Sequence, residues 1–166
     1  MMKVALLIPA LLALAGPGWA QSFDPAKPSM GFHCESAKGE PSLSFDFLVF
    51  LSGLRVTSEN FKRVEFRNVQ AEGVAISKVD SESGDLTNLM PPPGLIAFLN
   101  LNATALDPNS KAKVQLSSFI SVRAPAEGES LGDDNIKEHG LLTVSLGTQK
   151  HTITHDCVSI RGKLLS

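Results

Sequence analysis

The stretch that decides the fold class is SLSFDFLVFL, residues 42–51. Its odd-numbered positions, beginning with Leu43, are all apolar, whereas its even-numbered positions begin with Ser42, Ser44 and Asp46. Alternation with a period of two places successive side chains on opposite faces of a β-strand. The stretch therefore predicts a strand with one apolar face, which becomes apolar on both faces towards its end.

The same alternation recurs along the chain. Residues 114–122 repeat it clearly, and shorter candidate strands lie at 61–69, 73–79, 95–101, 141–146 and 150–160. Residues 146–149 predict a hairpin turn because Gly147 can adopt a positive φ. Many short strands separated by polar turns predict an all-β fold. Such a fold is an antiparallel sandwich or a barrel, and we favour an antiparallel β-sandwich of Ig-like or jelly-roll-like architecture.

The first twenty residues have the features of a cleavable signal peptide. Lys3 precedes an apolar run over residues 4–15, and small residues stand at Gly18 and Ala20. The run is shorter than the roughly 20 residues of a membrane-spanning helix, so we expect cleavage after Ala20. The expected organisation is a signal peptide at 1–20, a flexible N-terminal tail at 21–30 and a single β-sandwich domain at 31–166.

Composition narrows the expected location and partners. The chain has 15 Lys and Arg against 17 Asp and Glu. Loss of Lys3 with the signal leaves 14 against 17, a net charge of −3. This charge gives no electrostatic reason to expect nucleic acid. The chain has no Tyr, and its one tryptophan, Trp19, leaves with the signal, which weakens a lectin-like or single-strand-binding function. We expect a secreted or periplasmic protein that is monomeric and does not insert into a membrane after cleavage.

The two cysteines, Cys34 and Cys157, lie near opposite ends of the mature chain. In an oxidising compartment they most simply form one disulfide between an early strand and the last strand. Two free thiols or an intermolecular bridge are the alternatives.

A disulfide would also gather polar neighbours. By strand parity, His33, Glu35 and Asp156 point away from the bonded cysteines and could form a His–carboxylate group that binds a divalent ion or transfers protons. The simpler interpretation is a surface histidine near two solvated acids. His151 and His155 would lie about 13 Å apart on a strand, too far to share an ion.

Two segments interrupt the alternating pattern, residues 80–94 and residues 123–134. The first combines Asp, Ser and Gly with three prolines, and the second holds four acids with Gly and Pro. This composition predicts exposed loops, which either are merely solvated or carry binding residues. The candidate binding residues in them are Asp85, Met90, Pro91, Pro92, Pro93, Glu127, Glu129, Asp133 and Asp134.

Three further patterns in the sequence are weaker. The acidic loop offers oxygen ligands for Ca²⁺ but lacks EF-hand spacing, which favours a solvated loop. Residues 132–139 could form a short helical turn. Asn102 begins an Asn-x-Thr sequon, which predicts glycosylation only in a eukaryotic source.

Residues 128–132 (GESLG) match Gly-x-Ser-x-Gly, but they lie in a predicted loop and lack the strand-to-helix context of a nucleophile elbow. The sequence contains no glycine-rich phosphate loop. No cofactor is predicted, and a non-enzymatic protein is favoured. The expectation is an exported module that binds another protein or a surface component through long loops. One alternative is a metal-dependent enzyme or accessory factor using His33, Glu35 and Asp156, and another is an assembly subunit that pairs through an edge strand.

Overall fold

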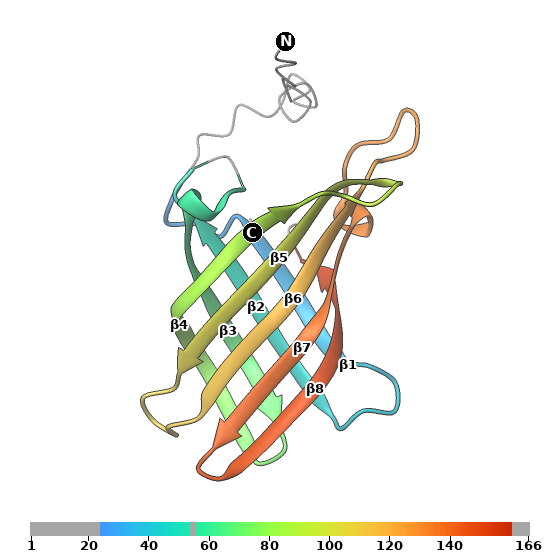
Figure 1. The fold of residues 1–166 in the computed structure, drawn as a ribbon. Helices are drawn as coiled ribbons and strands as arrows, with labels where there is room; N and C mark the ends of the chain where they lie inside the picture. Colours follow the sequence, from blue (N-terminus) through green and yellow to red (C-terminus); the bar gives the residue numbers. More distant parts are fainter. Residues whose placement is uncertain (1–23, 54–55, 161–166) are drawn as a thin grey trace, which may run out of the picture.

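The computed structural model describes residues 24–53 and 56–160, so the predicted signal peptide lies outside the described residues. Over this part the chain forms eight antiparallel strands in sequential order, and the last strand pairs with the first to close a barrel (Figure 1). The strands are β1 (Met30–Ser36), β2 (Leu43–Leu51), β3 (Phe61–Ala71), β4 (Val74–Leu89), β5 (Leu95–Leu106), β6 (Lys113–Arg123), β7 (Ile136–Leu146) and β8 (Gln149–Ser159).

The all-β prediction is confirmed, but the sandwich prediction is wrong. Each strand pairs with its neighbours in sequence, and β1 pairs with β8 from Phe32–Ser159 to Ser36–His155. A period of two appears in a sandwich and in a barrel alike, because both have one apolar and one polar face per strand. The pairing of the strands distinguishes them, here the sequential order and the pairing of the first strand with the last, and strand pairing leaves no periodic signal in the sequence.

The predicted disulfide between Cys34 and Cys157 is confirmed. The two residues are direct partners in the β1–β8 register, with their Cα atoms 4.1 Å apart. The bond therefore crosses the seam at which the barrel closes. Both cysteines are buried, and a buried disulfide is characteristic of proteins from oxidising compartments.

The two ends of the barrel differ. One end, here the turn end, carries the connections 37–42, 72–73, 107–112 and 147–148. The opposite end, here the loop end, carries residues 52–53 and 56–60 between β2 and β3 and the connections 90–94 and 124–135, and it lies at the top in Figure 1. Gly147 has a φ of 58° in the turn between β7 and β8, as predicted for that hairpin. No helix in the described segments is long and apolar enough to cross a membrane.

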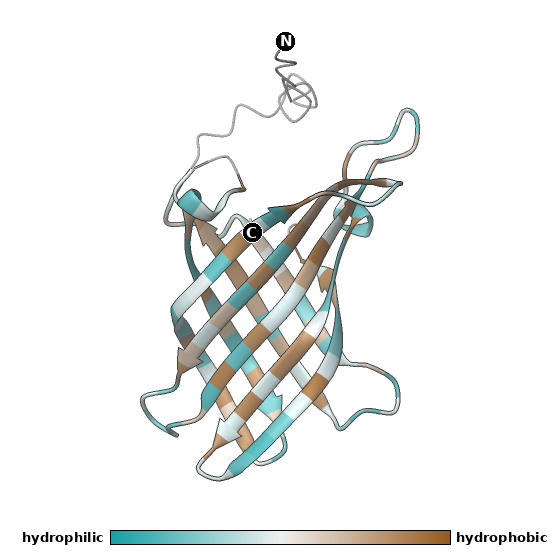
Figure 2. Ribbon diagram, in the orientation of Figure 1, coloured by the Kyte–Doolittle hydropathy of each residue, from teal (hydrophilic) through white to brown (hydrophobic). Residues whose placement is uncertain are grey.

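Apolar side chains fill the barrel. Phe32 stacks on Phe47 with ring centroids 4.9 Å apart, and Phe45 lies 6.1 Å from Phe47. Eight strands enclose an interior just wide enough for side chains to fill, and these rings are at most 1% exposed. Along the strands, hydrophobic and hydrophilic residues alternate (Figure 2). The alternation thus separates an apolar interior from a largely polar outer surface.

The predicted loop over residues 80–94 is wrong for most of its length. Residues 80–89 are the second part of β4, and only 90–94 form the connection to β5. Gly84 belongs in this strand because a Cβ there would lie 2.6 Å from the carbonyl oxygen of Asn102. The turn-like composition therefore marks a close approach of two strands rather than a loop.

The second predicted loop, residues 123–134, largely agrees with the structure. Residues 124–135 connect β6 to β7. The expected helical turn is shorter than 132–139, because only the 3₁₀ turn η2 (Asp133–Asn135) is helical and β7 begins at Ile136.

Candidate functional sites at the loop end

At the loop end, β4 continues beyond its pairing with β3 and forms a hairpin with β5. The β3–β4 register ends at Glu65 opposite Asp80, whereas the β4–β5 register continues to Leu89 opposite Phe98. Within the described residues, the last part of β4 therefore has a full ladder with β5 alone. Figure 1 shows the hairpin tip and the β6–β7 loop at the same end of the barrel.

Apolar side chains cover the outer surface of this hairpin. Met90 at the tip is 91% exposed, and Leu89 and Ile96 are also exposed. Leu89 is the register partner of Phe98, whose ring stacks on that of Phe119 at 5.4 Å. Figure 2 shows the hydrophobic colouring where β5 begins. We name this set of five side chains the apolar ridge.

The β6–β7 loop leaves the strand next to this hairpin and carries negative charge. Residues 124–135 include four acids and no Lys or Arg. Glu127 and Glu129 are exposed, while Asp133 accepts a hydrogen bond of 2.6 Å from the hydroxyl of Ser159 at the end of β8. The predicted binding residues Pro91, Pro92 and Pro93 are exposed in the neighbouring connection, and so are Asp85 on β4 and Asp134 in η2.

The outer surface of the β1–β8 seam carries the predicted His–carboxylate residues. Glu35 lies opposite Asp156 in the register, so the structure brings these two acids to adjacent strands. His33 Nδ1 lies 2.6 Å from Asp46 on β2, and its Nε2 lies 3.6 Å from Glu35. Asp156 instead pairs with His139, at 2.7 Å from its Nδ1.

The seam surface therefore holds two separate His–carboxylate pairs. Sequence reasoning missed Asp46 and His139 because both come from strands whose neighbours were not known. His33 and Glu35 belong to one pair and Asp156 to the other, so a metal-dependent activity that uses all three residues stays a prediction.

A second polar group lies inside the barrel. His155 Nε2 is 3.0 Å from Glu138 Oε1, and both side chains are completely buried. Within the described chain, His155 Nδ1, Glu138 Oε2 and the hydroxyl of Ser118 have no hydrogen-bond partner. The ring of Phe45 meets the imidazole edge-on, with centroids 5.0 Å apart. An unpaired buried polar atom costs about 1–3 kcal/mol, so this group calls for a physical explanation.

Sequence reasoning missed this interior group, although one signal for it was present. Strand parity correctly placed His155 on the same face as Cys157. It did not show that this face is the interior, nor that Glu138 is the register partner of Cys157.

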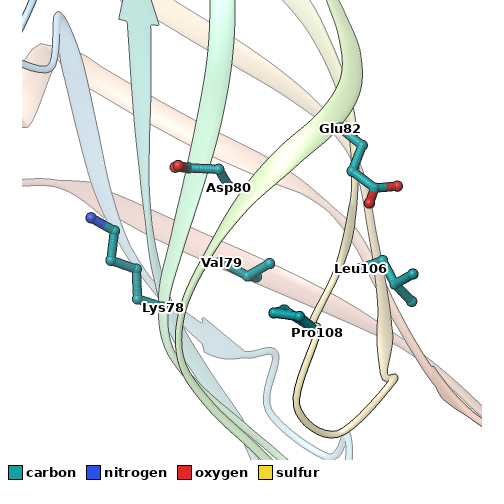
Figure 3. Close-up of a pocket in the computed structure, with 6 residues that line it drawn as sticks. All are labelled: Lys78, Val79, Asp80, Glu82, Leu106 and Pro108. Atoms are coloured by element: carbon teal, nitrogen blue, oxygen red, sulfur yellow. The ribbon is translucent and has the colours of Figure 1, made fainter.

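Shallow hollows on the outer surface are weaker candidates. The larger, of about 450 Å³, is lined by the six residues drawn in Figure 3, from β4 and from the end of β5 with its following turn. Two of its three charged residues are in ion pairs: Lys78 lies 2.9 Å from Glu65, and Asp80 lies 3.3 Å from Arg63. Asn102, the predicted glycosylation residue, borders a second hollow of about 370 Å³.

One carboxylate beside the first hollow has a shifted pKa. Burial alone would raise the pKa of Glu65, which is 2% exposed. Hydrogen bonds and the positive charges of Lys78 and Arg67 outweigh burial and hold the pKa of Glu65 below its ordinary value. This ion cluster joins β3 to β4 next to the point at which their pairing ends, and its role is structural.

These features define a class: a closed, disulfide-tied antiparallel barrel with a filled interior, a protruding apolar hairpin and an acidic loop at one end. Comparison with known protein families, with curated proteins and with solved structures finds no significant match to this chain.

Proposed function

We propose that this protein is an exported, non-enzymatic β-barrel that binds a partner protein through its loop end. The observation that carries the proposal is the apolar ridge, in which Met90 is 91% exposed and a stacked pair of phenylalanines lies on the outer surface. Contiguous exposed apolar side chains on an otherwise polar surface commonly mark an interaction site.

The neighbouring charges indicate the chemistry of the partner. An apolar ridge fits an apolar cleft, and the acidic β6–β7 loop beside it favours Lys and Arg at the border of that cleft. The same loop would be repelled by an anionic lipid surface. We therefore infer a protein partner whose apolar cleft has a basic rim.

Export is supported by the buried disulfide and by the pattern of residues 1–20. Cleavage after Ala20 gives a chain that begins at Gln21 and lacks both Trp and Tyr. Intact-mass measurement of the protein from its natural source should show this N-terminus, and its near-ultraviolet spectrum should lack the Trp and Tyr bands. A mass that includes residues 1–20 would contradict export by cleavage.

The binding proposal can be tested with a random peptide library displayed on phage. Peptides selected on the wild-type protein, with counterselection on Met90→Asp, should be apolar with flanking Lys or Arg. Their affinity should fall at least about tenfold on Met90→Asp, the effect expected of an anchor residue. It should also fall, in a salt-dependent way, on Glu127→Lys.

Leu106 provides the matched control, because it is an exposed apolar residue at the turn end, 41% accessible to solvent. Leu106→Asp should leave the selected peptides bound as in the wild type. Equal losses for Leu106→Asp and Met90→Asp would contradict a specific ridge. Flotation with zwitterionic vesicles tests a membrane as the binding target. Vesicle binding by the wild-type protein that is lost in Met90→Asp would contradict a protein partner and favour a membrane.

One observation favours the alternative of an assembly subunit. The part of β4 beyond Asp80 has only β5 as a strand partner in the described chain. Phe61 lies beside Gly84 and Asn88 donates a hydrogen bond to the carbonyl oxygen of Val56, so a strand from another chain can pair with this edge only where these contacts leave it open. Sedimentation equilibrium distinguishes the two functions. A monomer at high concentration favours a partner protein, whereas self-association that is lost in Thr87→Pro, on this edge, favours assembly.

A further inference from the structure

Four side chains with metal-binding atoms meet inside the barrel. They are Cys34, Glu138, His155 and Cys157, all buried, and their ligand atoms lie within 4.8 Å of one another. Among the described residues, it is the one group of three or more His, Cys, Asp or Glu side chains whose ligand atoms lie this close together. It is distinct from the apolar ridge, which lies on the outer surface.

The strand register fixes this arrangement. Cys157 on β8 has Cys34 as its partner on β1 and Glu138 as its partner on β7. His155 lies two residues before Cys157 on the same strand, so both side chains point to the interior. Three adjacent strands of a closed sheet thus hold the four side chains. Paired strands are rigid, and a metal site requires ligands that are held rigidly.

The polar atoms of the group are incompletely satisfied. His155 Nδ1 and Glu138 Oε2 have no hydrogen-bond partner among the described residues, although both atoms are buried. In folded proteins such atoms usually contact a water molecule or an ion. These unpaired atoms are an observation independent of the cysteines, and they too indicate that the group can accept a polar guest.

In the oxidised protein the two sulfurs are bonded to each other and are poor ligands for a divalent ion. A dithiol reductant changes this: two electrons break the S–S bond, each sulfur takes one proton, and the reductant becomes a disulfide. A metal ion then displaces the two thiol protons to solvent and meets two thiolates, one imidazole and one carboxylate. Sulfur and nitrogen ligands in a set of four favour Zn²⁺, whereas Ca²⁺ and Mg²⁺ require oxygen ligands.

We propose that reduction of the Cys34–Cys157 disulfide converts this interior group into a zinc site formed by Cys34, Cys157, His155 and Glu138. The ion joins β1, β7 and β8, so the seam of the barrel is closed by coordination when it is not closed by the covalent bond. Two thiolates and one carboxylate carry a charge of −3, so the complete site with Zn²⁺ has a net charge of −1. This small net charge limits the electrostatic cost of burying the ion.

Cobalt is the probe for the test, because tetrahedral thiolate ligation gives Co²⁺ intense visible bands and a near-ultraviolet charge-transfer band. The full chain is reduced anaerobically, freed of reductant and titrated with Co²⁺, then with Zn²⁺. The reduced protein should develop both bands with saturation at equal concentrations of ion and protein, and Zn²⁺ should abolish them. The oxidised protein should develop neither band.

Variants identify the ligands. His155→Ala and Glu138→Gln in the reduced protein should weaken Co²⁺ binding by at least about tenfold. His151→Ala is the matched control, since His151 lies on the same strand but pairs with Glu72, and it should leave binding unchanged. Equal weakening by His151→Ala and His155→Ala would overturn the assignment.

Far-ultraviolet circular dichroism covers the case in which the reduced barrel unfolds without metal. Zn²⁺ should then restore the strand signal of the wild type but not that of His155→Ala, because ion binding to the native state drives folding. A reduced barrel that stays folded and binds no Co²⁺ in tetrahedral form, or an unfolded one that Zn²⁺ does not refold, would overturn the proposal.

Discussion

The disulfide across the β1–β8 seam should supply a large share of the stability of the barrel. Cys34 and Cys157 are separated by 123 residues in sequence. In the chain-entropy model, releasing a loop of that length raises the entropy of the unfolded chain by an amount equivalent to about 5 kcal/mol near room temperature. Since small domains are stable by about 5–15 kcal/mol, reduction should bring the barrel close to unfolding.

Urea denaturation of the oxidised and reduced wild-type protein, with a chelator present to exclude metal, measures this loss. With an m-value of roughly 2 kcal/mol per molar urea, the midpoint should fall by roughly 2–3 M. The m-value should rise on reduction, because the unfolded chain without its cross-link exposes more surface. The double variant Cys34→Ala/Cys157→Ala should be less stable than the reduced wild type by about 1–2 kcal/mol, because removal of two buried sulfurs leaves small voids.

The comparison between the reduced wild type and the double variant separates the cross-link from packing. If the oxidised and reduced proteins had midpoints within about 0.5 M urea of each other, the cross-link would not be what stabilises the closed seam. If only the double variant lost stability, the contribution of the cysteines would come from packing in the core rather than from the cross-link.

Two further predictions concern the barrel wall. Gly140→Ala should destabilise the barrel by about 2–3 kcal/mol in urea denaturation. The reason is that the new Cβ would lie 2.5 Å from the carbonyl oxygen of Ser117. Gly132→Ala is the control and should have almost no effect, because its nearest contact would be at 3.9 Å. Equal effects would contradict the close approach at Gly140. The pKa of Glu65 is lowered in the folded state. The ionised carboxylate therefore contributes to the stability of the barrel above its ordinary pKa, and this contribution is lost as the pH falls through the pKa of the folded state. Glu65→Gln should accordingly reduce the loss of stability in acid. Identical pH profiles for wild type and Glu65→Gln, measured by urea unfolding between neutral and acid pH, would refute this.

Much of the fold could be predicted from local sequence. The alternation in 42–51 and 114–122 predicted β2 and β6 almost to their ends, and the pair of cysteines predicted the correct bond. Closure into a barrel could not be predicted, because it depends on hydrogen bonds between β1 and β8, which are over a hundred residues apart in the sequence. The disulfide did bring those strands together in the prediction, but a bond between two sheets of a sandwich would satisfy the same two cysteines.

The sites were predicted less completely than the strands, for a related reason. Exposure of Met90 and of the acidic loop followed from composition, because prolines and charges rarely pack inside a small domain. The partners of His33 and His155 did not follow, since Asp46 and Glu138 come from strands whose positions depend on the complete strand order. Local chemistry therefore predicted what is exposed, whereas contacts between strands required the fold.

The positions of the disulfide and of the protruding hairpin determine where the barrel can open. In the ring of eight strands, the β4–β5 pair lies diametrically opposite the β8–β1 seam. Next to that pair, β3 and β4 part beyond Glu65 and Asp80. Local unfolding proceeds where a ladder is incomplete, so native-state fluctuations should begin at the hairpin and leave the cross-linked strands intact. If the hairpin binds a partner as proposed, it can adapt its shape while the opposite wall remains ordered.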